Sequence, residues 1–140
     1  MSQYYDLGDE TLWNPSNGAS RLFLHQVAVF EAELGLPSGI GPMEMDESQV
    51  DPAALGVFAN ALLDRYQQSL HAVVRALTEG FLLTVLALAE RAGVGIRWEP
   101  SAPAPGAGLR DVQVPVGASA PDGVAELRRK VRELSRFMAR

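Results

Sequence analysis

Hydrophobic side chains recur at helical spacing over most of the first 100 residues. Four of them share one face of a predicted helix that starts at Pro15 or Arg21 and ends before Gly35, since glycine suits a helix C-terminus. These four are Phe23, Val27, Phe30 and Leu34. Residues 35–49 are interrupted by glycine and proline and predict a loop.

Two further helices are predicted over residues 52–68 and 69–93. Asp51 suits the N-cap of the first, and Pro52 suits its first turn. No glycine or proline marks the boundary between the two segments, so one long helix is an open alternative. The second segment is apolar nearly all round, which indicates a helix that is buried centrally or in a subunit interface. Six of its apolar residues share one face: Leu70, Val74, Leu77, Phe81, Val85 and Leu88.

The remaining segments predict a small β element and a separate helix. The N-terminal segment and residues 94–98 have the composition of short strands. Residues 101–121 predict a Pro/Ala/Gly-rich linker with a candidate edge strand, and residues 122–140 predict a basic amphipathic helix. The expected fold class is therefore mainly α, an antiparallel helical bundle with a small β element, in which residues 1–100 form the helical core domain.

The closing helix combines an apolar seam with basic flanks. Its apolar residues are spaced by three and four, the pattern of a coiled-coil seam about two heptads long: Val124, Leu127, Val131, Leu134 and Met138. Arg128 and Arg132 are among the basic residues beside it. Because so short a helix is marginal in water, the seam must pack on something. We expect it to rest on the protein's own acidic body or on a second copy, and a groove in a protein partner is the alternative.

The charge distribution narrows the choice of partner. The chain has a formal net charge of −5, and its first 100 residues hold thirteen acidic side chains against five arginines. Such a body repels phosphates, and no nucleic-acid-binding motif is present, so we expect no nucleic acid partner. The most apolar run, Phe81–Ala89, is far shorter than the ~20 residues of a membrane span. We expect a cytoplasmic protein with no membrane association.

The search for chemistry finds no catalytic set. The chain lacks cysteine, its two histidines have no partner at metal-ligand spacing, and no GxGxxG, P-loop or GxSxG motif occurs. We therefore expect no catalytic residue, no metal site and no cofactor. Whether the protein is an enzyme stays open, with the balance against it.

An apolar pocket is the main alternative to a protein interface. It would lie between the helix that ends at Leu34 and the helix over residues 69–93, and it would hold a small apolar ligand or the substrate of an unusual enzyme. The candidate lining is aromatic, with Glu79 or His71 as the polar group: Trp13, Phe23, Phe30 and Phe81.

Three segments resemble a family of small, uncharacterised actinobacterial proteins of unknown function. They are "GDETLWNPSNGASRLF", "GLPSGIGP" and "HAVVRALTEGFLLTVLALAERAG". The resemblance covers residues 3–98, leaves the closing helix outside, and implies no activity, ligand or catalytic residue.

These observations favour a non-catalytic protein that binds a protein partner or oligomerises. An immunity or accessory protein that acts beside a larger partner would have this size, acidity and lack of catalytic motifs. The alternative is the small apolar-ligand-binding helical domain or unusual small enzyme described above.

Overall fold

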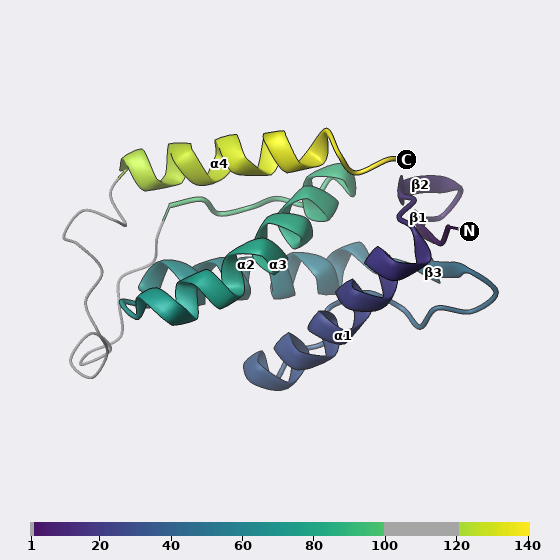
Figure 1. Ribbon diagram of the computed structural model, residues 1–140, viewed down its shortest axis with the longest axis horizontal. Helices are drawn as coiled ribbons and strands as arrows, with labels where there is room; N and C mark the ends of the chain where they lie inside the picture. Colours follow the sequence, from purple (N-terminus) through teal and green to yellow (C-terminus); the bar gives the residue numbers. More distant parts are fainter. Residues whose placement is uncertain (1, 100–120) are drawn as a thin grey trace.

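The computed structural model describes residues 2–99 and 121–140, which form four helices and three short strands (Figure 1). The prediction of a mainly α protein with a small β element is confirmed. The predicted linker over residues 101–121, with its edge strand, lies almost entirely outside the described residues. In chain order the elements are β1 (Tyr4–Leu7), β2 (Glu10–Trp13), α1 (Asn17–Leu34), β3 (Glu47–Gln49), α2 (Pro52–Gln68), α3 (Ala72–Arg91) and α4 (Pro121–Ser135).

The sheet contains a strand that the sequence pattern does not reveal. Its order is β2-β1-β3, with β1 antiparallel to β2 and parallel to β3. The prediction of a loop throughout residues 35–49 was wrong at β3, which is only three residues long and has no hydrophobic alternation. Its backbone pairs with β1, and the buried Ser48 hydroxyl donates to the carbonyl of Gly41 at 2.7 Å. Pairing with a distant strand, rather than local preference, therefore makes this segment extended.

The predicted strand over residues 94–98 is absent. This segment lies outside the sheet, and side chains of α2 take the place of a neighbouring strand. Asn60 donates from Nδ2 to the Gly95 carbonyl at 3.0 Å and accepts from the Arg97 amide at 2.8 Å. Gln67 donates to the Trp98 carbonyl at 2.9 Å. Since these amides satisfy the backbone polar groups, the segment is extended without belonging to a sheet.

Local capping divides the predicted helical region after residue 68. Ser69 is extended, and its hydroxyl accepts from the His71 amide at 3.2 Å. His71 is the N-cap of α3, where its Nδ1 accepts from the Val74 amide at 3.3 Å. The open alternative is settled in favour of two helices, because these two side chains satisfy amides that a continuous helix would bond internally.

The first helix starts between its two predicted starting points. Ser16 is the N-cap of α1, and its hydroxyl accepts from the Ala19 amide at 3.3 Å. At the other end Gly35 adopts the left-handed conformation with φ 66°, as expected for a terminating glycine. The predicted start of α2, with Asp51 as N-cap and Pro52 in the first turn, is confirmed.

The core is built around the second half of α3. The Phe81 ring lies 4.6 Å from Phe30 and 5.6 Å from Phe23 of α1, and 6.3 Å from Phe58 of α2. By length and composition, α3 is also the one helix in the described part of the chain that could cross a membrane. Its second half is buried among the other elements, as in the core helix of a globular domain.

The basic helix α4 packs along α3 (Figure 1), and most of its predicted seam is buried. Leu127, Val131 and Met138 are buried there. Arg91, at the end of α3, ties this region to the sheet: it donates to the Leu12 carbonyl at 2.6 Å and to the Met138 carbonyl at 2.8 Å. The apolar seam of α4 is therefore covered by α3 of the same chain.

Candidate functional site: an apolar groove between α1 and α3

The first half of α3 carries apolar side chains that the rest of the chain does not cover. Leu77 keeps 73% of its surface exposed, and Val73 and Val74 are exposed beside it. On α1, Leu22 and Val29 are exposed as well, one above the other at a spacing of seven residues. Single apolar residues on a surface are ordinary, but a contiguous group of this kind marks an interaction site.

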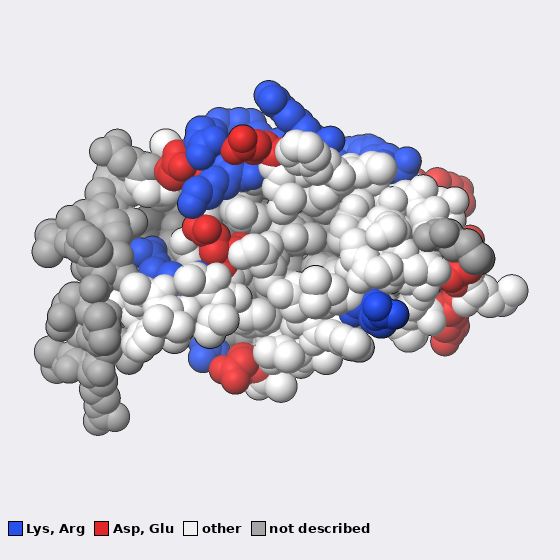
Figure 2. All heavy atoms as spheres, in the orientation of Figure 1, with Lys and Arg blue, Asp and Glu red and all other residues white. Residues whose placement is uncertain are grey.

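A groove of about 370 Å³ opens between α1, α2 and α3. Its size falls in the usual range of binding sites. Apolar side chains from the three helices line much of it: Val29, Phe30, Leu62, Val74 and Leu77. Figure 2 shows that most of the face below α4 carries neither acidic nor basic side chains. Charged side chains are sparse on this face. The groove itself is lined by three of them: Glu33, Arg65 and Arg75.

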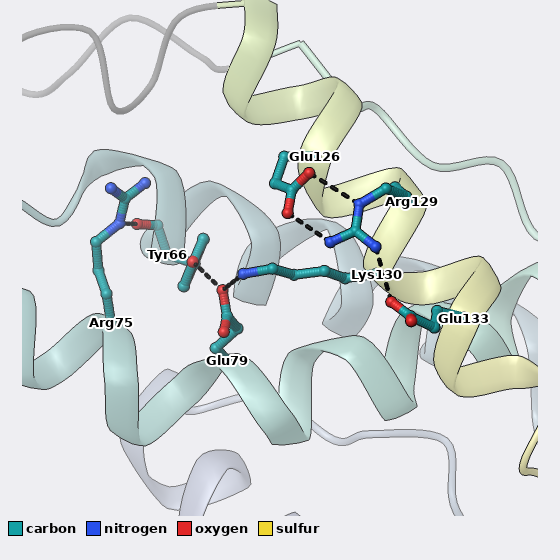
Figure 3. A network of polar contacts seen from close by, with 7 residues as sticks. All are labelled: Tyr66, Arg75, Glu79, Glu126, Arg129, Lys130 and Glu133. Carbon is teal, nitrogen blue, oxygen red and sulfur yellow. Dashed lines mark hydrogen bonds and ion pairs between the residues drawn. The ribbon is translucent and has the colours of Figure 1, made fainter.

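The inner wall of the groove holds a guanidinium group. Arg75 donates from Nε to the Tyr66 carbonyl at 3.1 Å, and its Cζ lies 4.6 Å from the centre of the Tyr66 ring. The bonded carbonyl belongs to the last turn of α2, where helix carbonyls lack internal partners. Figure 3 shows the two Nη atoms of Arg75 directed away from Glu79. Among the described residues no carboxylate forms an ion pair with Arg75.

The other charges at the groove neutralise each other. Arg65 and Glu33 lie at its edge and form an ion pair with an N–O distance of 3.1 Å. The lining thus presents a net positive charge at Arg75, on an otherwise apolar surface.

Tyr66 separates the groove from a polar network under α4. Its hydroxyl donates to Glu79 Oε1 at 2.9 Å, and Lys130 Nζ of α4 donates to the same oxygen at 3.0 Å (Figure 3). Burial, and next the hydrogen bond to Glu79, raise the pKa of Tyr66 to about 12. Tyr66 is therefore a neutral donor at physiological pH. A cavity of about 180 Å³ adjoins this network.

The network joins α4 to α2 and α3. Both donors reach the same carboxylate oxygen of Glu79, and both come from other elements than α3. Tyr66, Glu79 and Lys130 bind one another, so this arrangement forms a contact between the three helices.

The structure brings the four aromatic candidates for the pocket together as packed rings at the core, with Phe30 stacked on Phe81 at 4.6 Å. The rings of Trp13 and Phe23 lie 5.3 Å apart, and Phe23 also contacts Phe81, so these three aromatic side chains pack on each other within the core. Phe30 lines the groove. His71 caps α3 instead of facing a pocket.

The groove lies between the two helices of the predicted pocket, but most of its lining residues differ from those that the sequence suggested. Leu77 shares an apolar face with Phe81 in the sequence pattern, but it is exposed in the structure. Its neighbour in the heptad-like pattern, Phe81, is buried, so the periodicity could not distinguish the two. The sequence gives only a weak indication of the unpaired Arg75: it is a cation one helical turn before Glu79 in an apolar helix.

The apolar residues of the predicted partner seam are buried or partly buried, whereas its two arginines are exposed. Val124 and Leu134 are partly buried with the rest of the seam. Arg128 is exposed, with its Cζ 5.1 Å from the Trp98 ring centre, and Arg132 is exposed on the outer side of α4. In the described part of the chain no three His, Asp or Glu side chains gather at a distance suited to a metal ion.

All of residues 1–140 match the model of a family of unknown function, DUF6086. The chain belongs to this family. The predicted membership in a family of unknown function is confirmed, and the match extends beyond residues 3–98 to include the closing helix. Neither the curated proteins nor the solved structures include a match to the chain. The family carries no activity that could be transferred, so function must be argued from the groove.

Proposed function

We propose that this protein is a non-catalytic binding protein that receives an amphipathic helix of a protein partner in the groove between α1 and α3. The observation that carries the proposal is the exposed apolar surface around the groove, with Leu77 as its most exposed member. Leaving this surface in water costs free energy, at about 25 cal/mol per Å² of apolar area, which a partner recovers by covering it.

A protein partner fits this surface better than a small ligand does. Small ligands are largely enclosed by their sites. A small molecule in the groove would cover Val29 and Val74 but would leave Leu22 and Val73, which are exposed outside the cavity lining. A partner helix spans both areas, because it is about 10–12 Å wide with its side chains.

The helices on both sides suggest the form of the partner. An additional helix that lies between α1 and α3 can insert its own apolar ridge, with residues at positions i, i+3, i+4 and i+7, into the groove. Arg75 provides the specificity, because its unpaired guanidinium is complementary to an Asp or Glu on that helix. The expected partner segment is therefore apolar on one face, with an acidic residue beside that face.

A second copy of the chain is a poorer occupant. A symmetric dimer around this groove would bring the unpaired Arg75 side chains of both copies toward the same axis. Each copy also carries a net charge of −5, which opposes self-association. A partner that does not share the net charge of −5 avoids this repulsion, and an accessory or immunity protein would bind such a different, larger protein.

The test places a photo-crosslinking residue at Val29, on the groove, in the full chain. The crosslinked segment is then identified by mass spectrometry after irradiation in cells. We expect a segment of another protein with the amphipathic pattern and the acidic residue. Leu77→Glu should abolish the crosslink while leaving the free energy of unfolding within ~0.5 kcal/mol, since the residue is exposed. A synthetic peptide of that segment should bind the purified protein, and Arg75→Gln should weaken that binding by about tenfold.

The matched control uses Val57, which is 60% exposed on α2 and lies outside the groove. A crosslinker at Val57 should not capture the same segment, and Val57→Glu should not affect capture at Val29. Crosslinking at Val29 to a second copy would replace the proposal with self-association. The proposal would also be refuted if the Leu77→Glu protein still formed the crosslink at Val29, or if no protein were crosslinked at all.

A further inference from the structure

The outer side of α4 carries a row of arginines that the groove does not involve. Arg128 and Arg132 of α4, and Arg136 in the turn directly after the helix, are exposed and follow one another at intervals of four residues. In an α-helix this interval corresponds to about 6 Å along the axis. Figure 2 shows the basic side chains gathered on α4, along the upper edge of the molecule.

Glu126 and Glu133 of α4 do not neutralise this row. Arg129 binds both of its neighbours: it reaches Glu126 at 2.6 Å and Glu133 at 2.8 Å (Figure 3). The hydrogen bond from Arg129 holds the pKa of the Glu126 carboxyl below its usual range. In the part of the chain that the structure describes, Arg132 and Arg136 have no carboxylate partner.

The arginines of the row repel each other, because like charges four residues apart weaken a helix. Arg128 also contacts the body, with its Cζ 5.1 Å from the centre of the Trp98 ring. Other side chains of α4 fasten the helix to the body as well: Leu127 and Val131 are buried in the seam, and Lys130 pairs with Glu79 at 3.0 Å. A partner of opposite charge would relieve the repulsion within the row.

The body holds the row in a fixed arrangement. Arg91 donates to the carbonyl and the hydroxyl of Ser135 at 2.9 and 3.0 Å, at the end of α4. With the seam buried on α3, the backbone positions that bear the arginines are set before any partner arrives. Preorganisation of this kind lowers the entropic cost of binding.

We infer that the outer side of α4 is a docking surface for an extended acidic peptide whose Asp or Glu residues alternate along the chain. In an extended chain, alternate side chains lie on one face and are about 6.6–6.8 Å apart, close to the ~6 Å interval of the arginines. Each carboxylate can then pair with one guanidinium. The inference concerns a surface separate from the α1–α3 groove and does not depend on it.

The charge of the body favours a peptide over a longer polyanion. The first 100 residues carry thirteen acidic side chains against five arginines, so an anion that extends past α4 meets repulsion. A peptide of about ten residues covers the row without reaching far beyond the helix.

The experiment measures fluorescence anisotropy with the full chain at ~50 mM salt. One probe is a labelled ten-residue peptide of alternating Glu and Thr, and the second has the same composition with all Glu in one block. We expect the alternating peptide to bind more tightly. Arg132→Glu with Arg136→Glu should weaken it by about tenfold or more, since two attractive pairs become repulsive. Binding should also weaken at higher salt, because the pairs are exposed.

The control variant, Arg21→Glu with Arg97→Glu, changes the net charge equally but lies outside α4, and it should retain most of the affinity. Circular dichroism establishes that each variant is folded. The inference is overturned if the alternating peptide does not bind, if the block peptide binds equally well, or if both double variants lose the same affinity. Tighter binding of a single-stranded oligonucleotide or an anionic vesicle would overturn it as well, because the surface would then recognise another class of partner.

Discussion

Replacing Leu127 with alanine tests whether α4 is an integral part of the fold. Leu127 is 4% exposed and belongs to the hydrophobic core that α4 shares with α3. Removing its outer carbons forfeits about 0.8 kcal/mol of transfer free energy per buried methylene and leaves a cavity beside them. We expect the free energy of unfolding to fall by about 2–4 kcal/mol, a large share of the ~5–15 kcal/mol of a typical domain.

Urea unfolding followed by far-UV circular dichroism measures this change. With a slope of ~2 kcal/mol per molar urea, the midpoint should fall by about 1–2 M. Phe137→Ala is the matched control, because Phe137 lies in the same C-terminal segment but is 83% exposed. It should change the free energy of unfolding by no more than ~0.5 kcal/mol.

The reasoning would be refuted by an unchanged midpoint in the Leu127→Ala protein. Such a result would mean that α4 contributes no packing energy to the isolated chain. The seam would then be a surface for another molecule, and its burial on α3 would not persist in solution.

Two further predictions concern the polar contacts. The pKa of Tyr66 is raised from 10.0 to about 12, so the stability that its neutral form contributes is complete below pH 10 and is lost as the pH rises through about 12. Urea unfolding across this range should show a smaller loss of stability for Tyr66→Phe than for the natural protein, and equal losses would contradict the assignment. Arg91→Lys should lower the free energy of unfolding by about 2 kcal/mol, because one ammonium cannot replace the separate guanidinium contacts to Leu12 and Met138. An unchanged thermal unfolding midpoint would show that Arg91 does not connect α4 to the sheet.

Features that depend on nearby residues were predictable. The helix start at Asp51 and Pro52 follows from a side chain that accepts hydrogen bonds two and three residues away. The end of α1 at Gly35 follows from a backbone conformation that glycine adopts without strain. The heptad-like seam of α4 also correctly identified the side of that helix that is buried.

Features that depend on distant partners were not predictable. The short strand β3 owes its conformation to β1, more than forty residues earlier in the chain. The segment over residues 94–98 has a strand-like composition, but Asn60 satisfies its backbone, so it joins no sheet. Neither segment's own sequence indicates whether it joins a sheet. The outcome depends on which distant group, a strand or a side chain, bonds to its backbone.

The same limit applies to the candidate site. Leu77 and Phe81 belong to one apolar stripe of α3, yet α1 covers Phe81 and leaves Leu77 exposed. Periodicity describes which side chains share a face of a helix, but it cannot say how far a neighbouring helix extends along that face. The groove and the unpaired Arg75 in its wall therefore emerge only when three helices are placed together.

By itself, the sequence determined the helical character of the long segments, several of their ends, the apolar side of α4 and the absence of recognisable catalytic motifs. These depend on spacing and on residues within a few positions of each other. The tertiary structure decided that the α4 seam rests on α3, that the first half of α3 stays uncovered, and that a row of arginines faces outward. Burial is set by contacts between segments far apart in the chain, and residue spacing does not encode those contacts.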